Sequence, residues 1–230
     1  MLGQDMWNLI VEESPYMIAA MLAAPIVLVL SGLIAGKAER PVRSTSIFVL
    51  GAVILDLIFA AVILWLLHVV GISSEDNISA WIDTLLGVLF LVIGIKAAID
   101  RPTEEEKATQ RARMEKIAAA KATSLLLAGV LVQIVNADAL AVFGSGLKEI
   151  AITTPYPTAA TIVVVVLVFL FVMLVPYHLP IWLYVASPEK AGGKMRAMSA
   201  WLLDHAQALE VVVGLGFGAL FLFKGLTALL

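Results

Sequence analysis

The chain has 230 residues, 61% of them hydrophobic and 14% charged, with a mean hydropathy of +1.00 and a net charge of −3. Soluble domains average about 45–50% apolar and about 25% charged residues, so the composition predicts an integral membrane protein, and the small net charge gives no reason to expect nucleic acid as a partner. The absence of cysteine excludes disulfides, thiolate metal sites, iron–sulfur clusters and thiol redox relays.

The first 15 residues differ from the rest of the chain. They contain Asp5, Glu12 and Glu13, and no Lys or Arg occurs before residue 37. A secretory signal peptide needs a positively charged start. We therefore expect 1–15 to be an N-terminal interfacial segment that stays in the mature protein.

Six apolar stretches follow, each long enough for a membrane helix, which needs about 20 residues. The predicted fold class is all-α, with transmembrane helices at 16–36, 46–70, 79–99, 122–147, 158–186 and 206–229. These helices divide the chain into a first three-helix half (16–99), a charged cytoplasmic loop (100–121) and a second three-helix half (122–230).

The distribution of Lys and Arg predicts the orientation, because cytoplasmic connections are enriched in these residues. Thirteen of the 15 basic residues fall in or beside the first, third and fifth connections, and the other two are Lys148 and Lys224. Both chain ends are therefore expected outside, and the membrane is expected to be the cytoplasmic one.

The two halves share a sequence pattern. The third predicted helix, "DTLLGVLFLVIGIKAAI", and the sixth, "EVVVGLGFGALFLFKGLTAL", both begin with an acidic residue, contain several glycines and have a Lys near the end. A three-helix unit that is repeated once must be inverted, and inverted repeats are typical of transporters. The alternative is that any two apolar helices look alike.

Polar residues inside the predicted spans are candidates for a substrate or ion site, because ionisable groups are costly in the membrane. Asp56 is about eleven residues into the second span, and Asn136 and Asp138 about fifteen into the fourth. At about 1.5 Å per residue, these three lie near the midplane. Gln133 shares a helix face with Asn136, although an amide in a membrane helix often serves only to pack helices.

Helix breaks are expected near Asn136 and at three prolines. Asp138 lies about 200° around a regular helix from Asn136, so the two side chains can face one ligand only if the fourth helix is unwound there. Pro25 is expected to interrupt the first span, and Pro176 and Pro180 the fifth. His178 lies between the last two and is a further candidate, because histidine titrates near neutral pH.

The loop 100–121 is expected to form an amphipathic helix that is either solvated or lies on the membrane surface. Its Arg111, Arg113 and Lys116 are candidate contacts for anionic lipid headgroups.

The order of these features resembles the lysine-exporter (LysE) superfamily, which has six helices, a basic loop after the third and an Asn-led break in the fourth. Within it, 16–229 is most similar to the GAP family, whose members are named for addressing sulfolipids and glycopeptidolipids to the cell surface. The similarity is strongest in "LLGVLFLVIGIKAAI" and from "VPYHLPIWLYVASPEK" to "ALFLFKGL". Family members usually carry an Asn-Pro-Lys-Asn type motif in the fourth helix, where this chain has Asn136-Ala137-Asp138-Ala139.

The resemblance implies a transporter, or a transport accessory protein, that helps to export a lipid or glycolipid, with membrane lipids and envelope lipid-export machinery as partners. Two alternatives remain: a proton-coupled exporter of a metal cation or amino acid, since hard cations bind carboxylate and amide oxygens, and a non-transporting scaffold of a cell-envelope complex. A homo-oligomer is compatible with the small-residue faces. No nucleophile–base pair or metal-ligand motif is present, so neither an enzyme, a cofactor nor a bound metal is expected.

Overall fold

The computed structural model describes residues 2–22, 25–37, 39–71, 77–100, 103–152 and 157–230. These residues form helices joined by short connections, and no strand occurs among them. In chain order the helices are α1 (Leu2–Leu22), α2 (Pro25–Lys37), α3 (Pro41–Val70), α4 (Asn77–Ile99), α5 (Glu104–Ala118), α6 (Ala122–Val135), α7 (Ala137–Ile152), α8 (Ala159–Met173), α9 (Val175–Ala186) and α10 (Pro188–Leu229).

Three helical segments are long and apolar enough to cross a membrane by themselves: Pro41–Val70, Asn77–Ile99 and the 204–229 part of α10. Two further spans are possible if each bent pair counts as one, because α6 and α7 meet at 72° and α8 and α9 at 66°. The described chain therefore has three to five candidate spans. The first predicted span, 16–36, is divided between α1 and α2 and is not among them.

The outer surface explains the hydropathy of the chain. Large apolar side chains are exposed along the long helices, as Trp65 is in α3, Leu85 in α4 and Phe223 in α10. A soluble protein rarely exposes apolar patches of this extent, whereas lipid solvates them. The chain is a multi-pass membrane protein.

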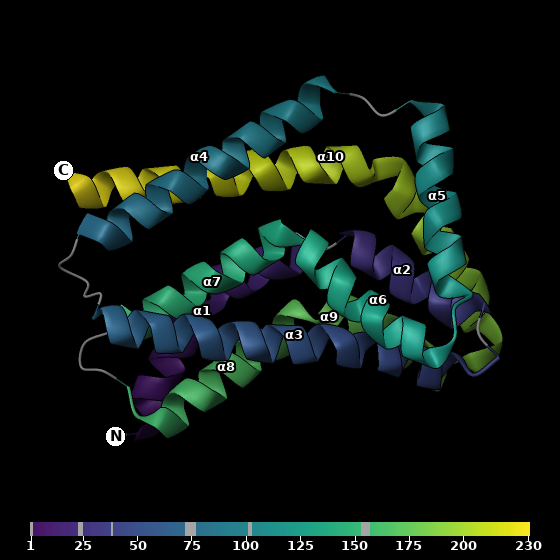
Figure 1. Ribbon diagram of the computed structural model, residues 1–230, viewed down its shortest axis with the longest axis horizontal. Helices are drawn as coiled ribbons and strands as arrows, with labels where there is room; N and C mark the ends of the chain where they lie inside the picture. Colours follow the sequence, from purple (N-terminus) through teal and green to yellow (C-terminus); the bar gives the residue numbers. More distant parts are fainter. Residues whose placement is uncertain (1, 23–24, 38, 72–76, 101–102, 153–156) are drawn as a thin grey trace.

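The helices run mostly along the long axis of the molecule, and α5 lies across one end of it (Figure 1). The beginning of α1 and the end of α10 both lie at the opposite end, on opposite sides of the molecule (Figure 1). Thr103 caps α5 by accepting from the Glu106 N–H, and the Glu106 carboxylate accepts from the Thr103 N–H in return. The segment 104–118 is thus a helix, and it buries Met114 and Ala118 in the core.

Glycines allow a close crossing of α4 and α10, which lie side by side (Figure 1). A Cβ added at Gly94 would lie 2.7 Å from the Leu215 backbone nitrogen, and one at Gly214 would lie 2.6 Å from the Gly94 Cα. Only small residues allow two backbones to approach this closely. The glycine face of 214–218 is therefore used for packing within the chain.

Candidate functional site

A first buried polar cluster joins three helices. The Nε2 of Gln133 (α6) donates a 2.8 Å hydrogen bond to Oδ1 of Asp56 (α3), and the Tyr177 hydroxyl (α9) donates to Oε1 of the same Gln133. All three side chains are buried. Two predicted site residues are thus brought together, and Tyr177 is a third member that the sequence analysis missed.

The break expected near Asn136 is present. The α6 helix ends at Val135, Asn136 has φ −79° and ψ 52°, and α7 starts at Ala137. Asp138 consequently lies in the first turn of α7, where the helix dipole favours a carboxylate. The bend therefore places Gln133 and Asp138 on two differently oriented helices, and Asp138 has a role in the start of α7.

Pro25 and Pro176 stand in the first turn of a helix, whereas the break expected at Pro180 is wrong. The α9 helix continues through Pro180, and the Pro176 carbonyl, to which Pro180 cannot donate, accepts from the Ser31 hydroxyl at 3.3 Å. The α2 helix begins at Pro25. The α8 and α9 helices meet at Leu174, just before Pro176, while Pro180 lies inside α9. His178 is turned back onto its own helix, with Nδ1 2.8 Å from the Leu174 carbonyl oxygen and its ring stacked on Trp182.

The basic residues of α5 lie apart from these clusters. Arg113 and Lys116 are exposed, which leaves them accessible to lipid headgroups, and Arg113 lines a shallow groove with Thr103 and Glu106. Arg111 belongs to α5, but its side chain lies outside the described part of the structure.

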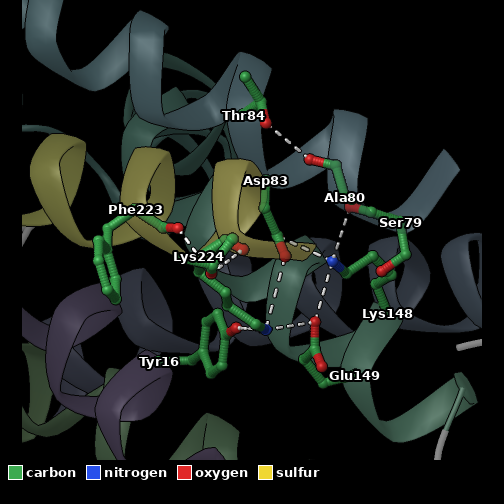
Figure 2. Close-up of polar contacts among 10 residues, drawn as sticks. Tyr16, Ser79, Ala80, Asp83, Thr84, Lys148, Glu149, Phe223 and Lys224 are labelled. Carbon is green, nitrogen blue, oxygen red and sulfur yellow. Dashed lines mark hydrogen bonds and ion pairs between the residues drawn. The ribbon is translucent and has the colours of Figure 1, made fainter. Parts of the chain in front are cut away.

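A second polar cluster, which the sequence analysis missed as a site, is built around Lys148 of α7. Its Nζ lies 2.7 Å from Oδ1 of Asp83 (α4), 2.9 Å from Oε1 of Glu149 and 3.2 Å from the Ser79 carbonyl oxygen (Figure 2). The Lys148 and Asp83 side chains are only 2–3% exposed. Buried charges require such pairing, because their desolvation is otherwise uncompensated.

The cluster continues to Lys224 on α10. Its ammonium lies 2.7 Å from Oε1 of Glu149 and 3.5 Å from Oδ2 of Asp83, and it donates to the Tyr16 hydroxyl of α1 (Figure 2). Two lysines and two carboxylates thus balance each other, at the meeting point of four helices. We call Tyr16, Asp83, Lys148, Glu149 and Lys224 the ion network.

A cavity of about 650 Å³ opens beside the ion network. Tyr16, Glu149 and Lys224 line one part of it together with Glu12 and Glu13. The rest of its lining is mainly apolar and comes from α1, α7 and α10: Pro15, Ala19, Ile152, Phe217, Leu220 and Phe221. The cavity is therefore amphipathic, with a charged end and an apolar wall.

Glu13 differs from the carboxylates of the ion network. Its side chain is 2% exposed, and its Oε2 has no hydrogen-bond partner among the described residues. A buried acceptor without a partner is costly, and within the described part of the chain Glu13 forms no ion pair, since Lys148 and Lys224 pair with Asp83 and Glu149.

One sequence signal could have pointed to the ion network. Lys148 and Lys224 are the two basic residues that do not follow the cytoplasmic bias, and Lys224 ends an apolar helix. Only the fold shows that both lysines contact Asp83, an acid on a distant helix.

The described residues contain no group of three or more His, Asp or Glu side chains that could hold a metal ion.

The arrangement can hold an amphiphile, because one cavity offers both charged groups and an apolar wall.

No curated protein and no solved structure matches the chain. A family model does match, over residues 17–227: the model for Sap, the sulfolipid-1-addressing protein. This range includes the cavity-lining residues from Ala19 onward and all of the ion network except Tyr16. The chain belongs to the family of sulfolipid-1-addressing proteins.

Proposed function

We propose that the protein assists the translocation or export of a lipid or glycolipid across the cytoplasmic membrane, as a transporter or as a transport accessory protein. The observation that carries the proposal is the amphipathic cavity. Its volume of about 650 Å³ falls within the range of small-molecule sites, about 300–1,000 Å³. Its apolar wall, with Phe217 and Phe221, fits an acyl chain, and its charged end fits a headgroup. The lipid-addressing family supports the same assignment.

The helix contacts support a transporter-like repeat of two three-helix units. In the first unit α1–α2 is followed by α3 and α4, and in the second α6–α7 is followed by α8–α9 and α10. The α1 helix packs on α8 as α6 packs on α3, and α2 packs on α10 as α7 packs on α4. Exchanging the two units therefore preserves these contacts. Six spans related by an inverted repeat, with both ends outside, agree with this pattern and with the shared position of the chain ends (Figure 1).

A second candidate function, export of a small cation or amino acid, is favoured by the first polar cluster. Asp56 is fully buried, and its Oδ2 has no hydrogen-bond partner in the described part of the chain. Carboxylate and amide oxygens such as those of Asp56 and Gln133 suit a hard cation. In either function the residues serve binding, and no catalytic role is proposed.

The deciding experiment is lipid analysis of a deletion strain. We expect one surface lipid class to be lost from the envelope and to accumulate inside, and the wild-type gene to restore it. Leu220→Trp should fail to restore it, because Leu220 lines the cavity and a larger side chain would fill it. Phe223→Trp is the matched control, since Phe223 is 70% exposed and does not line the cavity.

The other outcomes separate the alternatives. Unchanged lipids combined with hypersensitivity to a metal or an amino acid would support the small-solute exporter instead. Unchanged lipids with loss of an envelope complex from the membrane would support a scaffold. Full restoration by Leu220→Trp would exclude the cavity as the lipid site.

A further inference from the structure

We propose that Asp56 is a proton-binding site, whose carboxyl group holds a proton while α3, α6 and α9 are packed as in this structure and exchanges it reversibly with water. The inference goes beyond the proposed function, because it assigns a proton instead of a substrate and concerns the first polar cluster instead of the cavity. Acidic side chains inside membrane spans serve as proton relays in pumps and transporters.

Asp56 is a buried acid without a cation. It lies in the middle of α3, which is a candidate membrane span, and its side chain is fully buried. It takes part in no ion pair in the described part of the chain, and its Oδ2 has no hydrogen-bond partner there. Asp83 is buried to a similar degree, but the Nζ of Lys148 lies 2.7 Å from its Oδ1.

A negative charge on Asp56 would therefore have nothing to offset its desolvation. Tyr177, on α9, is the titratable group that faces it, and α6 contributes the neutral Gln133. No charged group acts on Asp56 from the described parts of the other helices packed on α3. A buried carboxylate in such surroundings becomes neutral by taking up a proton. The neutral form leaves one O–H group unpaired, which costs much less than an uncompensated charge.

The orientation of Gln133 favours a proton over a metal ion. Its Nε2 donates to Oδ1 of Asp56 at 2.8 Å, and its Oε1 accepts from the Tyr177 hydroxyl. The amide thus turns its N–H groups toward Asp56 and keeps its oxygen occupied. A hard cation such as Ca²⁺ takes about six to eight oxygen ligands, so it would need the amide to turn over. A proton needs only the free Oδ2.

Helix breaks stand next to both partners of Asp56. Gln133 comes just before the bend at Asn136, where α6 and α7 meet at 72°, and Tyr177 just after the bend at Leu174, where α8 and α9 meet at 66°. Hinge movements commonly use a few residues at the ends of helices. Movement at these breaks would therefore change the packing around the carboxyl group.

The two partner helices are attached to α3 in different ways. A Cβ added at Gly129 of α6 would overlap the Phe48 carbonyl oxygen of α3, so these helices pack backbone against backbone. The α9 helix joins the cluster through the Tyr177 side chain, whose hydroxyl donates to Gln133 and whose ring stacks on Phe48 with 5.9 Å between centroids. Withdrawal of Tyr177 would admit water to Asp56 while Asp56 and Gln133 stay together, which gives the proton a route in and out.

The test is an infrared titration of the full-length protein in nanodiscs from pH 5 to pH 10, with the spectrum of Asp56→Asn subtracted at each pH. A protonated carboxyl group and a carboxylate absorb at different frequencies, so the difference reports the charge of Asp56. We expect the protonated form at pH 6, where an aspartate in water is ionised, and its reversible conversion to the carboxylate before pH 10. The matched control subtracts Asp204→Asn, at an exposed acid, and should show a carboxylate at every pH.

A pair of glutamine variants tests the role of the cluster. Gln133→Leu removes the donor that stabilises the carboxylate, so Asp56 should release its proton about one pH unit higher than in the wild type. Gln207→Leu removes a comparable hydrogen bond, to the Ala97 carbonyl oxygen at 2.7 Å, and should leave the titration unchanged. The wild-type titration decides the inference even if Gln133→Leu does not fold.

Three results would overturn the inference. A carboxylate at pH 6 would show that Asp56 is charged where it is buried. A protonated form that persists at pH 10 would make it a permanently neutral packing group. A conversion that moves to lower pH when Na⁺ replaces choline in the buffer would show that the site takes a metal cation. Because the titration requires no transport, a normal lipid profile in the deletion strain would remove the proposed function without affecting this result.

Discussion

Gln133 and Asp56, 77 positions apart in sequence, are joined by a 2.8 Å hydrogen bond at a site where both side chains are fully buried. The same amide accepts from the Tyr177 hydroxyl. One side chain of α6 therefore holds α3 and α9 together inside the protein. Because neither lipid nor water reaches the amide, its two partners depend on it.

Replacing Gln133 should be more costly than replacing Tyr177. Gln133→Leu leaves both the Asp56 carboxyl and the Tyr177 hydroxyl without this partner, and each unpaired buried group costs about 1–3 kcal/mol. Tyr177→Phe removes one hydroxyl and should cost about 1 kcal/mol. Thermal unfolding in nanodiscs measures both. Equal losses for the two variants would show that Gln133 does not connect the helices energetically.

Breaking the ion network at its buried lysine should destabilise the protein strongly. Lys148→Met leaves Asp83 without its closest cation, and the loss of one partner of a buried pair costs about 3–5 kcal/mol. The double variant Lys148→Met/Asp83→Asn should recover much of this, because it also removes the buried charge. Unfolding measurements on the three proteins test the pairing, and a double variant no more stable than Lys148→Met would contradict it.

The α4–α10 crossing should not tolerate a methyl group. Gly94→Ala would place a Cβ 2.7 Å from the Leu215 backbone nitrogen, where no side chain can move aside, and overpacking costs about 1–3 kcal/mol. Gly216→Ala is the control on α10, because nothing lies within 4 Å of its added Cβ. That change should be neutral or stabilising by up to about 1 kcal/mol. A similar loss for both variants would argue against the close approach.

The cap of α5 should depend on pH. The Thr103 N–H lowers the pKa of Glu106 in the folded protein by donating to its carboxylate. A depressed pKa means that the contribution is present above the unfolded pKa, near 4.3–4.5, and is lost as pH falls through the folded value. Hydrogen exchange in 104–118 should accelerate relative to the rest of the chain on going from pH 6 to pH 3. In Glu106→Gln that relative acceleration should disappear, and its persistence would refute the assignment.

Local patterns in the sequence predicted a large part of the helical structure. Continuous apolar runs predicted helices, and Asn136, Pro25 and Pro176 fell where helices begin or end, because backbone geometry depends on neighbouring residues. The family resemblance found in the third predicted helix and the C-terminal region agrees with the family match over 17–227. Of the buried polar residues, Asp56 and Gln133 were recognised because they interrupt apolar runs.

The tertiary structure alone decided which residues share a site. The sequence showed Asp83 and Lys224 only as charged residues near the ends of two similar helices, and it assigned Glu13 to an interfacial segment, because sequence indicates the depth of a residue but not its neighbours. The bend at α6–α7 and the glycine crossing of α4 on α10 accompany a fold in which acids and lysines from α4, α7 and α10 meet beside one cavity. Burial then makes the pairing of each charge decisive, since a buried charge without a partner is costly. The ligand chemistry of the cavity therefore follows from helix packing, which no local pattern in the sequence encodes.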